Sequence, residues 1–84
     1  MAESSIYQPS TGQDGFPAPD QLSTKVGRRI RDRRRALGLT QRALAAPYTK
    51  SYVSAVERGR VLPSLRILSF LAERLGVGVG DLVD

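Results

Sequence analysis

Cationic side chains are the most chemically distinctive feature of this 84-residue sequence. Six arginines fall within eight consecutive positions: Arg28, Arg29, Arg31, Arg33, Arg34 and Arg35. Residues 25–60 carry a net charge of +9, whereas residues 1–24 carry −3 and residues 61–84 carry −1. A basic block this dense and this localised is typical of a protein that binds a polyanion. A basic surface kept only for solubility is the simpler alternative, but solubility requires neither the density nor the localisation.

The residue types that the sequence lacks also restrict its chemistry. It has no Cys and no His, which removes disulfides, thiolate ligands, the commonest general base and the commonest metal ligand. Gly76, Gly78 and Gly80 superficially suggest a phosphate-binding loop, but they follow an expected helix instead of a strand. No apolar run is long enough to span a bilayer, and the N-terminus lacks the order of a signal peptide. We therefore expect a cytoplasmic protein that is not an enzyme and uses no metal or cofactor.

Two short helices joined by a tight turn are predicted between Thr40 and Gly59, and the rest of the chain is organised around them. Thr40 can cap a first helix, which ends at Pro47 because proline has no amide hydrogen and disfavours helix in the preceding residue. Thr49 can cap a second helix over residues 50–58. In this second helix, Val53 and Val56 are expected to face inward, and Ser51, Ser54 and Ala55 to face outward. An ordinary amphipathic helix would show the same pattern, so periodicity alone does not indicate a ligand.

The helix before this pair carries most of the arginines. It is predicted to begin at a cap, Ser23 or Thr24, and to end at Gly38, with a narrow apolar stripe of Val26, Ile30 and Leu37. Residues 1–23 mix Pro, Gly, Ser and acidic residues without a hydrophobic period, so we expect a disordered N-terminal arm. Like charges within a turn of one another destabilise a helix, and such a cluster is understandable if the helix binds an anion. The arginines without an apolar role are Arg28, Arg29, Arg31 and Arg35.

A strongly apolar helix is predicted from its cap at Ser64 to Gly76. Its stripe consists of Leu65, Leu68, Leu71, Ala72 and Leu75. Ile67 and Phe70 lie off this stripe, and extra core or a dimer contact would explain them equally well. A turn and a short last helix follow, in which Val79, Leu82 and Val83 close the core. The fold class is therefore all-α, a compact five-helix bundle in one domain of residues 24–84.

From Val26 to Val83 the sequence resembles the helix-turn-helix domain of the XRE family, the phage repressor and Cro type. The resemblance rests on VGRRIRDRRRALGLTQRALA, on SYVSAVERGRVLPSL, and on LAERLGV followed by DLV, in the order of the family. It implies a repressor-like arrangement of the five helices. The turn between Ala45 and Ser51 is shorter than is usual in the family. Tyr48 is expected to fill the core position of the aliphatic residue that this turn lacks.

The resemblance implies sequence-directed binding of double-stranded DNA, with the helix from Thr49 to Arg58 in the major groove. Positions that match base-contacting positions of the family are Lys50, Ser51, Ser54 and Ala55, with Tyr52 flanking them. Positions that match phosphate-contacting positions are Gln41, Arg42, Thr49, Arg58 and Arg60. Arg34 and Glu57 match a partly buried ion pair of the family. We expect this pair to be structural, because a free carboxylate near DNA would repel it.

These observations predict a transcription regulator, a repressor that binds double-stranded DNA as a homodimer on a pseudo-palindromic site. An antitoxin or other protein-sequestering module is one alternative, and it would show an exposed apolar patch around Ile67 and Phe70. A controller protein of a restriction-modification system shares the fold and size, and the sequence does not separate it from other repressors. Binding of RNA or an anionic membrane is a further alternative, for which residues 28–35 alone would suffice.

Overall fold

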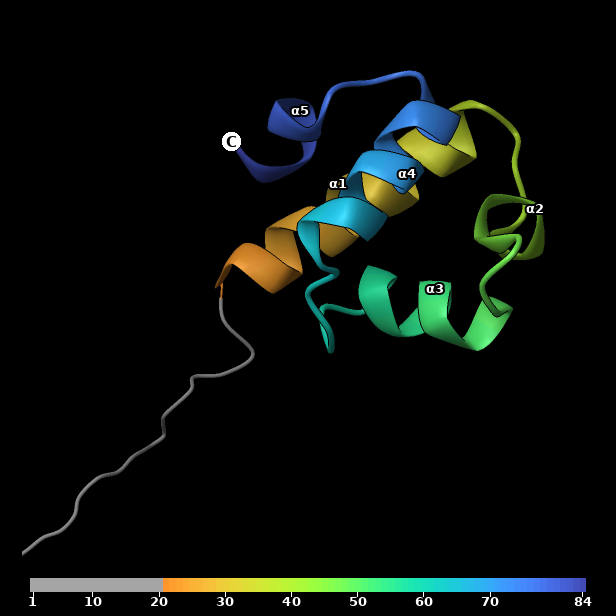
Figure 1. The fold of residues 1–84 in the computed structure, drawn as a ribbon, viewed down its shortest axis with the longest axis horizontal. Coiled ribbons are helices and arrows are strands. Elements are labelled where there is room, and N and C mark those ends of the chain that lie inside the picture. The colour runs from red at the N-terminus through yellow and green to blue at the C-terminus, as the bar shows by residue number, and fades with distance from the viewer. Residues whose placement is uncertain (1–20) are drawn as a thin grey trace, which may run out of the picture.

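The computed structural model describes residues 21–84, which form five α-helices and no strand (Figure 1). The helices are α1 (Gln21–Ala36), α2 (Gln41–Ala45), α3 (Lys50–Glu57), α4 (Leu65–Leu75) and α5 (Val79–Val83). The predicted all-α, five-helix fold is confirmed. Most of the expected N-terminal arm, residues 1–20, lies outside the described residues.

The first helix begins earlier than predicted. Gln21 and Leu22 already belong to α1, so the two expected caps, Ser23 and Thr24, lie inside its first turn. Ser23 is buried, and the backbone of Thr24 lies close against Gly59, 3.1 Å from where a side chain on that glycine would begin. Tertiary packing thus holds the start of α1, and the prediction of an arm through residue 23 is wrong for residues 21–23.

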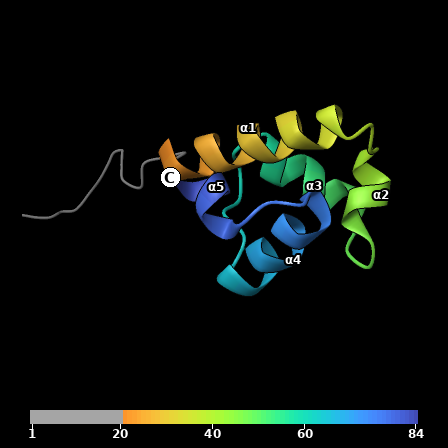
Figure 2. The ribbon, with the colours of Figure 1, turned by 90° about the horizontal axis from the view of Figure 1, so that it is seen from above.

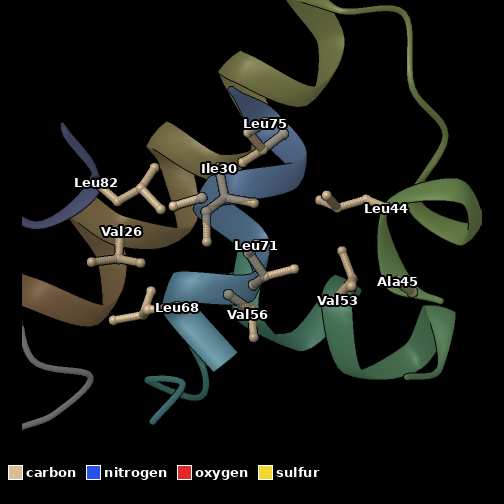
Figure 3. Packing of buried hydrophobic residues seen from close by; sticks show 11 residues of the cluster. Val26, Ile30, Leu44, Ala45, Val53, Val56, Leu68, Leu71, Leu75 and Leu82 are labelled. Carbon is tan, nitrogen blue, oxygen red and sulfur yellow. The ribbon is translucent and has the colours of Figure 1, made fainter. Parts of the chain in front are cut away.

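Buried apolar side chains from all five helices meet in one core (Figure 3). Figures 1 and 2 place α2 and α5 at opposite ends of the bundle, with α1 running between them. The core members are Val26, Ile30, Leu44, Ala45, Val53, Val56, Leu68, Leu71, Ala72, Leu75 and Leu82. Removing apolar surface from water stabilises a fold by about 25 cal/mol per Å². This cluster therefore holds the helices that surround it in place.

Two leucines that were predicted to be buried are exposed. Leu37 is 44% exposed because α1 ends at Ala36, so the helical period no longer sets the direction of the next side chain. Leu65 is 70% exposed because it is the first residue of α4, in the turn that projects beyond the other helices in Figure 2. By contrast, Ile67 and Phe70 are partly buried against the core, which accounts for them as extra core.

Helix α1 lies close against α3 at Gly27. A Cβ atom on this buried glycine would lie 2.9 Å from the carbonyl oxygen of Glu57 and nearer still to that of Val56. Both obstacles are backbone atoms in the last turn of α3, which cannot rotate away as a side chain would. The missing side chain at residue 27 therefore sets the separation of the two helices.

We expect Gly27→Ala to destabilise the fold by about 1–3 kcal/mol, because the two helix backbones must separate to admit the methyl group. Thermal and urea unfolding followed by circular dichroism would measure the change. Gly80→Ala is the matched control, since it adds a methyl to another helix where the nearest atom is the flexible end of Asp84, 3.3 Å away. The control should keep or raise stability, because alanine favours helix over glycine by about 1 kcal/mol. A Gly27→Ala protein that unfolds like the wild type would contradict the close approach.

Candidate nucleic-acid interface

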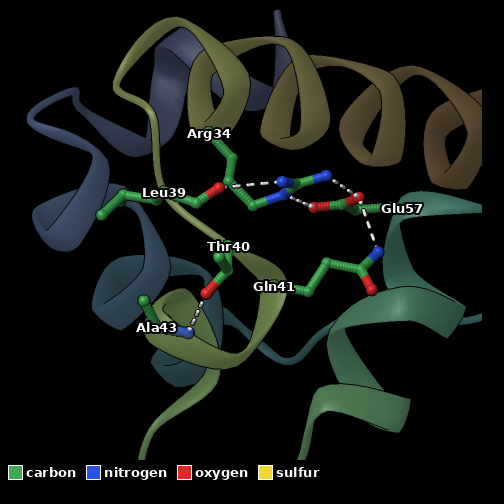
Figure 4. A network of polar contacts seen from close by, with 6 residues as sticks. All are labelled: Arg34, Leu39, Thr40, Gln41, Ala43 and Glu57. Atoms are coloured by element: carbon green, nitrogen blue, oxygen red, sulfur yellow. Dashed lines mark hydrogen bonds and ion pairs between the residues drawn. The ribbon is translucent and has the colours of Figure 1, made fainter.

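Two threonine caps define the helix pair formed by α2 and α3. The hydroxyl of Thr40 accepts a hydrogen bond of 3.0 Å from the amide of Ala43, and the hydroxyl of Thr49 accepts one of 3.1 Å from the amide of Tyr52 (Figure 4 shows the first). Both caps were predicted from the sequence and are confirmed. They fix where each short helix starts, and so which side chains of α3 face outward.

The prediction for Tyr48, in the turn between the two helices, is wrong. Tyr48 does not fill a core position, since its side chain is 38% exposed. Its ring instead packs edge-on against Phe70 of α4, with the ring centroids 5.4 Å apart, and lies 6.1 Å from the ring of Tyr52. Leu44 and Ala45 already occupy the core at the end of α2, which leaves Tyr48 to cover the outside.

An ion pair joins α1 to the end of α3 (Figure 4). The Nε of Arg34 donates to Oε2 of Glu57 over 2.6 Å, and its Nη2 donates to Oε1 over 3.0 Å. Arg34 also donates to the carbonyl of Leu39, and Gln41 of α2 donates to the same Glu57 oxygen over 3.0 Å. Hydrogen bonding to Glu57 raises the pKa of Arg34 above its usual value. The carboxylate is thus fully engaged and buried, with its charge balanced inside the fold.

Two other arginines of α1 donate hydrogen bonds to carbonyls at the ends of neighbouring helices. Arg33 donates to the carbonyl of Leu75, the last residue of α4, over 2.9 Å. Arg29 donates to the carbonyl of Asp84, just after α5, over 2.7 Å. The last carbonyls of a helix have no partner within the helix, and a cation there also balances the helix dipole. In the sequence Arg29 was noted only as an arginine without an apolar role, because nothing in the local sequence shows which carbonyls a long side chain reaches.

Arg31 and Arg35 of α1 contribute to a polar pocket of about 220 Å³ between α1 and α3. It is lined by Arg31, Arg34, Arg35, Gln41, Lys50, Ser54, Glu57 and Arg58. Four residues predicted for DNA contact therefore come together here: Gln41, Lys50, Ser54 and Arg58. Arg31 and Arg35 were noted in the sequence only as part of the basic block. The only sign of the pocket in the sequence is that Arg31 and Arg35 are four residues apart and therefore lie on one face of their helix, with Lys50 in the helix pair that follows.

The other predicted contact residues lie around this pocket with differing exposure. Ser51 is exposed on α3, and Ala55 is partly buried. Tyr52 packs partly against the core, and burial, with a smaller effect of Tyr48, raises the pKa of its hydroxyl. Of the residues expected to contact phosphate, Gln41 is partly buried. The others are exposed: Arg42, Thr49, Arg58 and Arg60. The outward surface of α3 is thus short, polar and bordered by cations.

Other kinds of site find little support in the part of the chain that the structure describes. Residues 21–84 contain no group of three or more acidic side chains arranged to hold a metal ion. None of the five helices is both long and apolar enough to cross a membrane.

Comparison with known sequences identifies the helix pair. A family model described as a helix-turn-helix domain matches residues 25–84. The chain belongs to the helix-turn-helix family. Among solved structures it is similar to the clp gene regulator ClgR from Corynebacterium glutamicum, with 31% identity and a TM-score of 0.70, over 77% of this chain and 71% of ClgR. It is also similar to the competence regulator ComR from Streptococcus vestibularis, with 33% identity and a TM-score of 0.70, over 76% of this chain and 22% of ComR.

The same helix-turn-helix fold also occurs within an enzyme. The chain is 30% identical to the hydroxypropylphosphonic acid epoxidase from S. wedmorenis, with a TM-score of 0.70, over 75% of this chain and 35% of the epoxidase. The chain thus spans about a third of the epoxidase and most of the length of ClgR. A comparison with curated proteins gives no match. Because regulators and an enzyme share the fold, function has to be argued from the site.

We expect Glu57→Gln to destabilise the fold by about 3 kcal/mol, because it leaves the partly buried guanidinium of Arg34 without its counter-charge. Chemical unfolding at neutral pH would measure the loss. Glu73→Gln removes an exposed carboxylate from α4 and serves as the control, for which a change within about 0.5 kcal/mol is expected. Equal stability of the two variants would show that the ion pair does not stabilise the fold.

Proposed function

We propose that this helix-turn-helix chain is a sequence-specific double-stranded DNA-binding domain of a transcription regulator, in which α3 enters the major groove. The observation that carries the proposal is the division of α3 into two faces beside the basic pocket. Val53 and Val56 are completely buried, whereas Lys50 and Ser51 are exposed. The similarity to the regulators ClgR and ComR supports the same function.

The dimensions and side chains of α3 suit a groove. Eight residues make a helix about 12 Å long, comparable with the width of the major groove of about 12 Å. Lys50 can donate to guanine O6 or N7, the hydroxyls of Ser51 and Ser54 can donate or accept, and Ala55 can contact a thymine methyl. Tyr52 would flank these contacts. Base recognition of this kind relies on few hydrogen bonds, so the shape and backbone of the DNA contribute strongly.

Backbone contacts in this proposal come from residues on both sides of the outward face of α3. Arg58 and Arg60 follow α3, Arg42 lies on α2, and all three are exposed cations. Gln41 and Thr49 stand at the starts of α2 and α3, where their backbone amides add donors. Phosphate contacts of this kind set the orientation of the protein and supply most of the affinity that depends on salt. A repressor acting as a homodimer on a pseudo-palindromic site would use this arrangement twice.

Two of the alternatives are less well supported by the described residues. An antitoxin was expected to expose Ile67 and Phe70, but both pack against the core. Binding of RNA or an anionic membrane by a free arginine-rich helix is also disfavoured. Three arginines of α1 are already engaged within the fold: Arg29, Arg33 and Arg34. A restriction-modification controller would use the same DNA interface and is a subset of the proposed function.

Binding to random-sequence duplex DNA should weaken steeply with salt, because cationic side chains displace counterions from the phosphates. If a dimer neutralises about 6 phosphates, the logarithm of the association constant should fall against the logarithm of salt concentration with a slope of about −5. Fluorescence anisotropy of a labelled duplex between low and physiological salt would measure the slope. Absence of binding, or binding independent of salt, would contradict the proposed function.

Lys50→Ala should reduce base discrimination by about 1–3 kcal/mol at the base pair that the ammonium group contacts. Selection of binding sites from random duplexes, followed by competition with single-base variants, would locate that position. Arg60→Ala is the comparison variant, because loss of a phosphate contact should weaken binding to all sequences alike. If Lys50→Ala selected the same sites with undiminished preference at every position, Lys50 would not read a base.

A further inference from the structure

The side chain of Arg31 has an unusual environment on α1. Its Nε is the single buried side-chain nitrogen or oxygen in residues 21–84 without a hydrogen-bond partner. A charged donor that is shielded from water and left without an acceptor is unfavourable, and proteins rarely leave one unless something else supplies the acceptor. The atom belongs to a residue that lines the polar pocket between α1 and α3, so an occupant of that pocket could supply it.

The charge balance of the pocket indicates the kind of occupant. Five cationic side chains and one carboxylate line it, a net charge of +4. Glu57 and Arg34 neutralise each other across the ion pair. The cations that remain donate no side-chain hydrogen bond within the described part of the chain: Arg31, Arg35, Lys50 and Arg58. Two come from α1 and two from α3 or its end, so an anion between them would meet donors from opposite sides.

We propose that this pocket is a binding site for a single phosphate group, held chiefly by Arg31 and Arg35. A phosphate offers several oxygens to donors from different directions, and guanidinium groups bind it through paired hydrogen bonds. The inference rests on the proposed function in one respect, since a phosphodiester of the bound DNA beside α3 is one source of that group. A free phosphate or phosphate monoester is the other source, with the same chemistry.

Occupation of the pocket would also relieve a repulsion within α1. Arg31 and Arg35 are four residues apart and therefore neighbours on one helix face, where like charges destabilise a helix. A bound phosphate lies between them and the cations of α3, and so draws α1 and α3 together. A ligand that binds only the folded state raises its stability. Phosphate should therefore raise the melting temperature as well as occupy the site.

Nuclear magnetic resonance on the 15N-labelled full chain tests the site directly, with inorganic phosphate as the probe. We expect saturable shifts of the Arg31 Nε–H signal and of the amides of Ser54 and Arg58. Chloride and acetate at equal ionic strength should not produce them. Arg31→Gln and Arg35→Gln should each weaken phosphate binding about tenfold, the loss expected for one charged hydrogen bond. Lys25→Gln removes an exposed charge from the first turns of the same helix and should leave binding unchanged.

Duplex DNA forms the second arm and separates the two sources. If DNA supplies the group, the same Arg31 signal shifts with random duplex, and Arg35→Gln makes the salt slope shallower by about 1 while Lys25→Gln does not. If phosphate shifts the signal but bound duplex does not, the pocket is a site for free phosphate and not for a phosphodiester of DNA. If the wild type binds no duplex, the proposed function fails and the phosphate titration alone decides the pocket. Equal responses to phosphate, acetate and chloride, or an unmoved Arg31 signal in both arms, overturn the inference.

Discussion

The pairing of Arg34 with Glu57 is the interaction on which the arrangement of this fold depends. It links α1 to the end of α3, and through Gln41 and Leu39 it also holds α2 and the loop before it. Glu57 is one of only two acids within residues 25–60, and both of its oxygens are engaged. A basic segment therefore folds around one internal negative charge, and the position of α3 follows from it.

Five of the six arginines of α1 fall into two groups with different surroundings. Arg29, Arg33 and Arg34 satisfy carbonyls and a carboxylate inside the fold, and these contacts offset the mutual repulsion of their charges. Arg31 and Arg35 have no such partner within the described residues and face the pocket beside α3. Clustered charge in a small domain can thus serve the fold or remain available for a ligand, and only the contacts of each side chain distinguish the two.

The parts of this structure that depend on local chemistry were predictable from the sequence. Thr40 and Thr49 cap helices because a hydroxyl can reach an amide three residues on, whatever surrounds them. Leu65 and Tyr48 were predicted wrongly because their burial depends on which other elements reach them. The partners of Arg29 and Arg33 lie 55 and 42 residues away, so no local pattern specifies them. The base- and phosphate-contacting residues remain predictions that rest on resemblance.

Few side chains of α3 can form hydrogen bonds with bases, so base recognition by this helix would depend more on its placement than on its side chains. A helix with one cationic and two hydroxyl side chains facing outward can discriminate bases only if its backbone is held at a fixed depth and tilt. Gly27 and the ion pair provide that constraint from the α1 side, since both fix the end of α3. The caps and the aromatic cover of Tyr48 on Phe70 fix its beginning. For the DNA-binding function proposed above, small outward residues are an advantage, because they would let a rigid helix approach a groove closely and leave recognition to the fit of two surfaces.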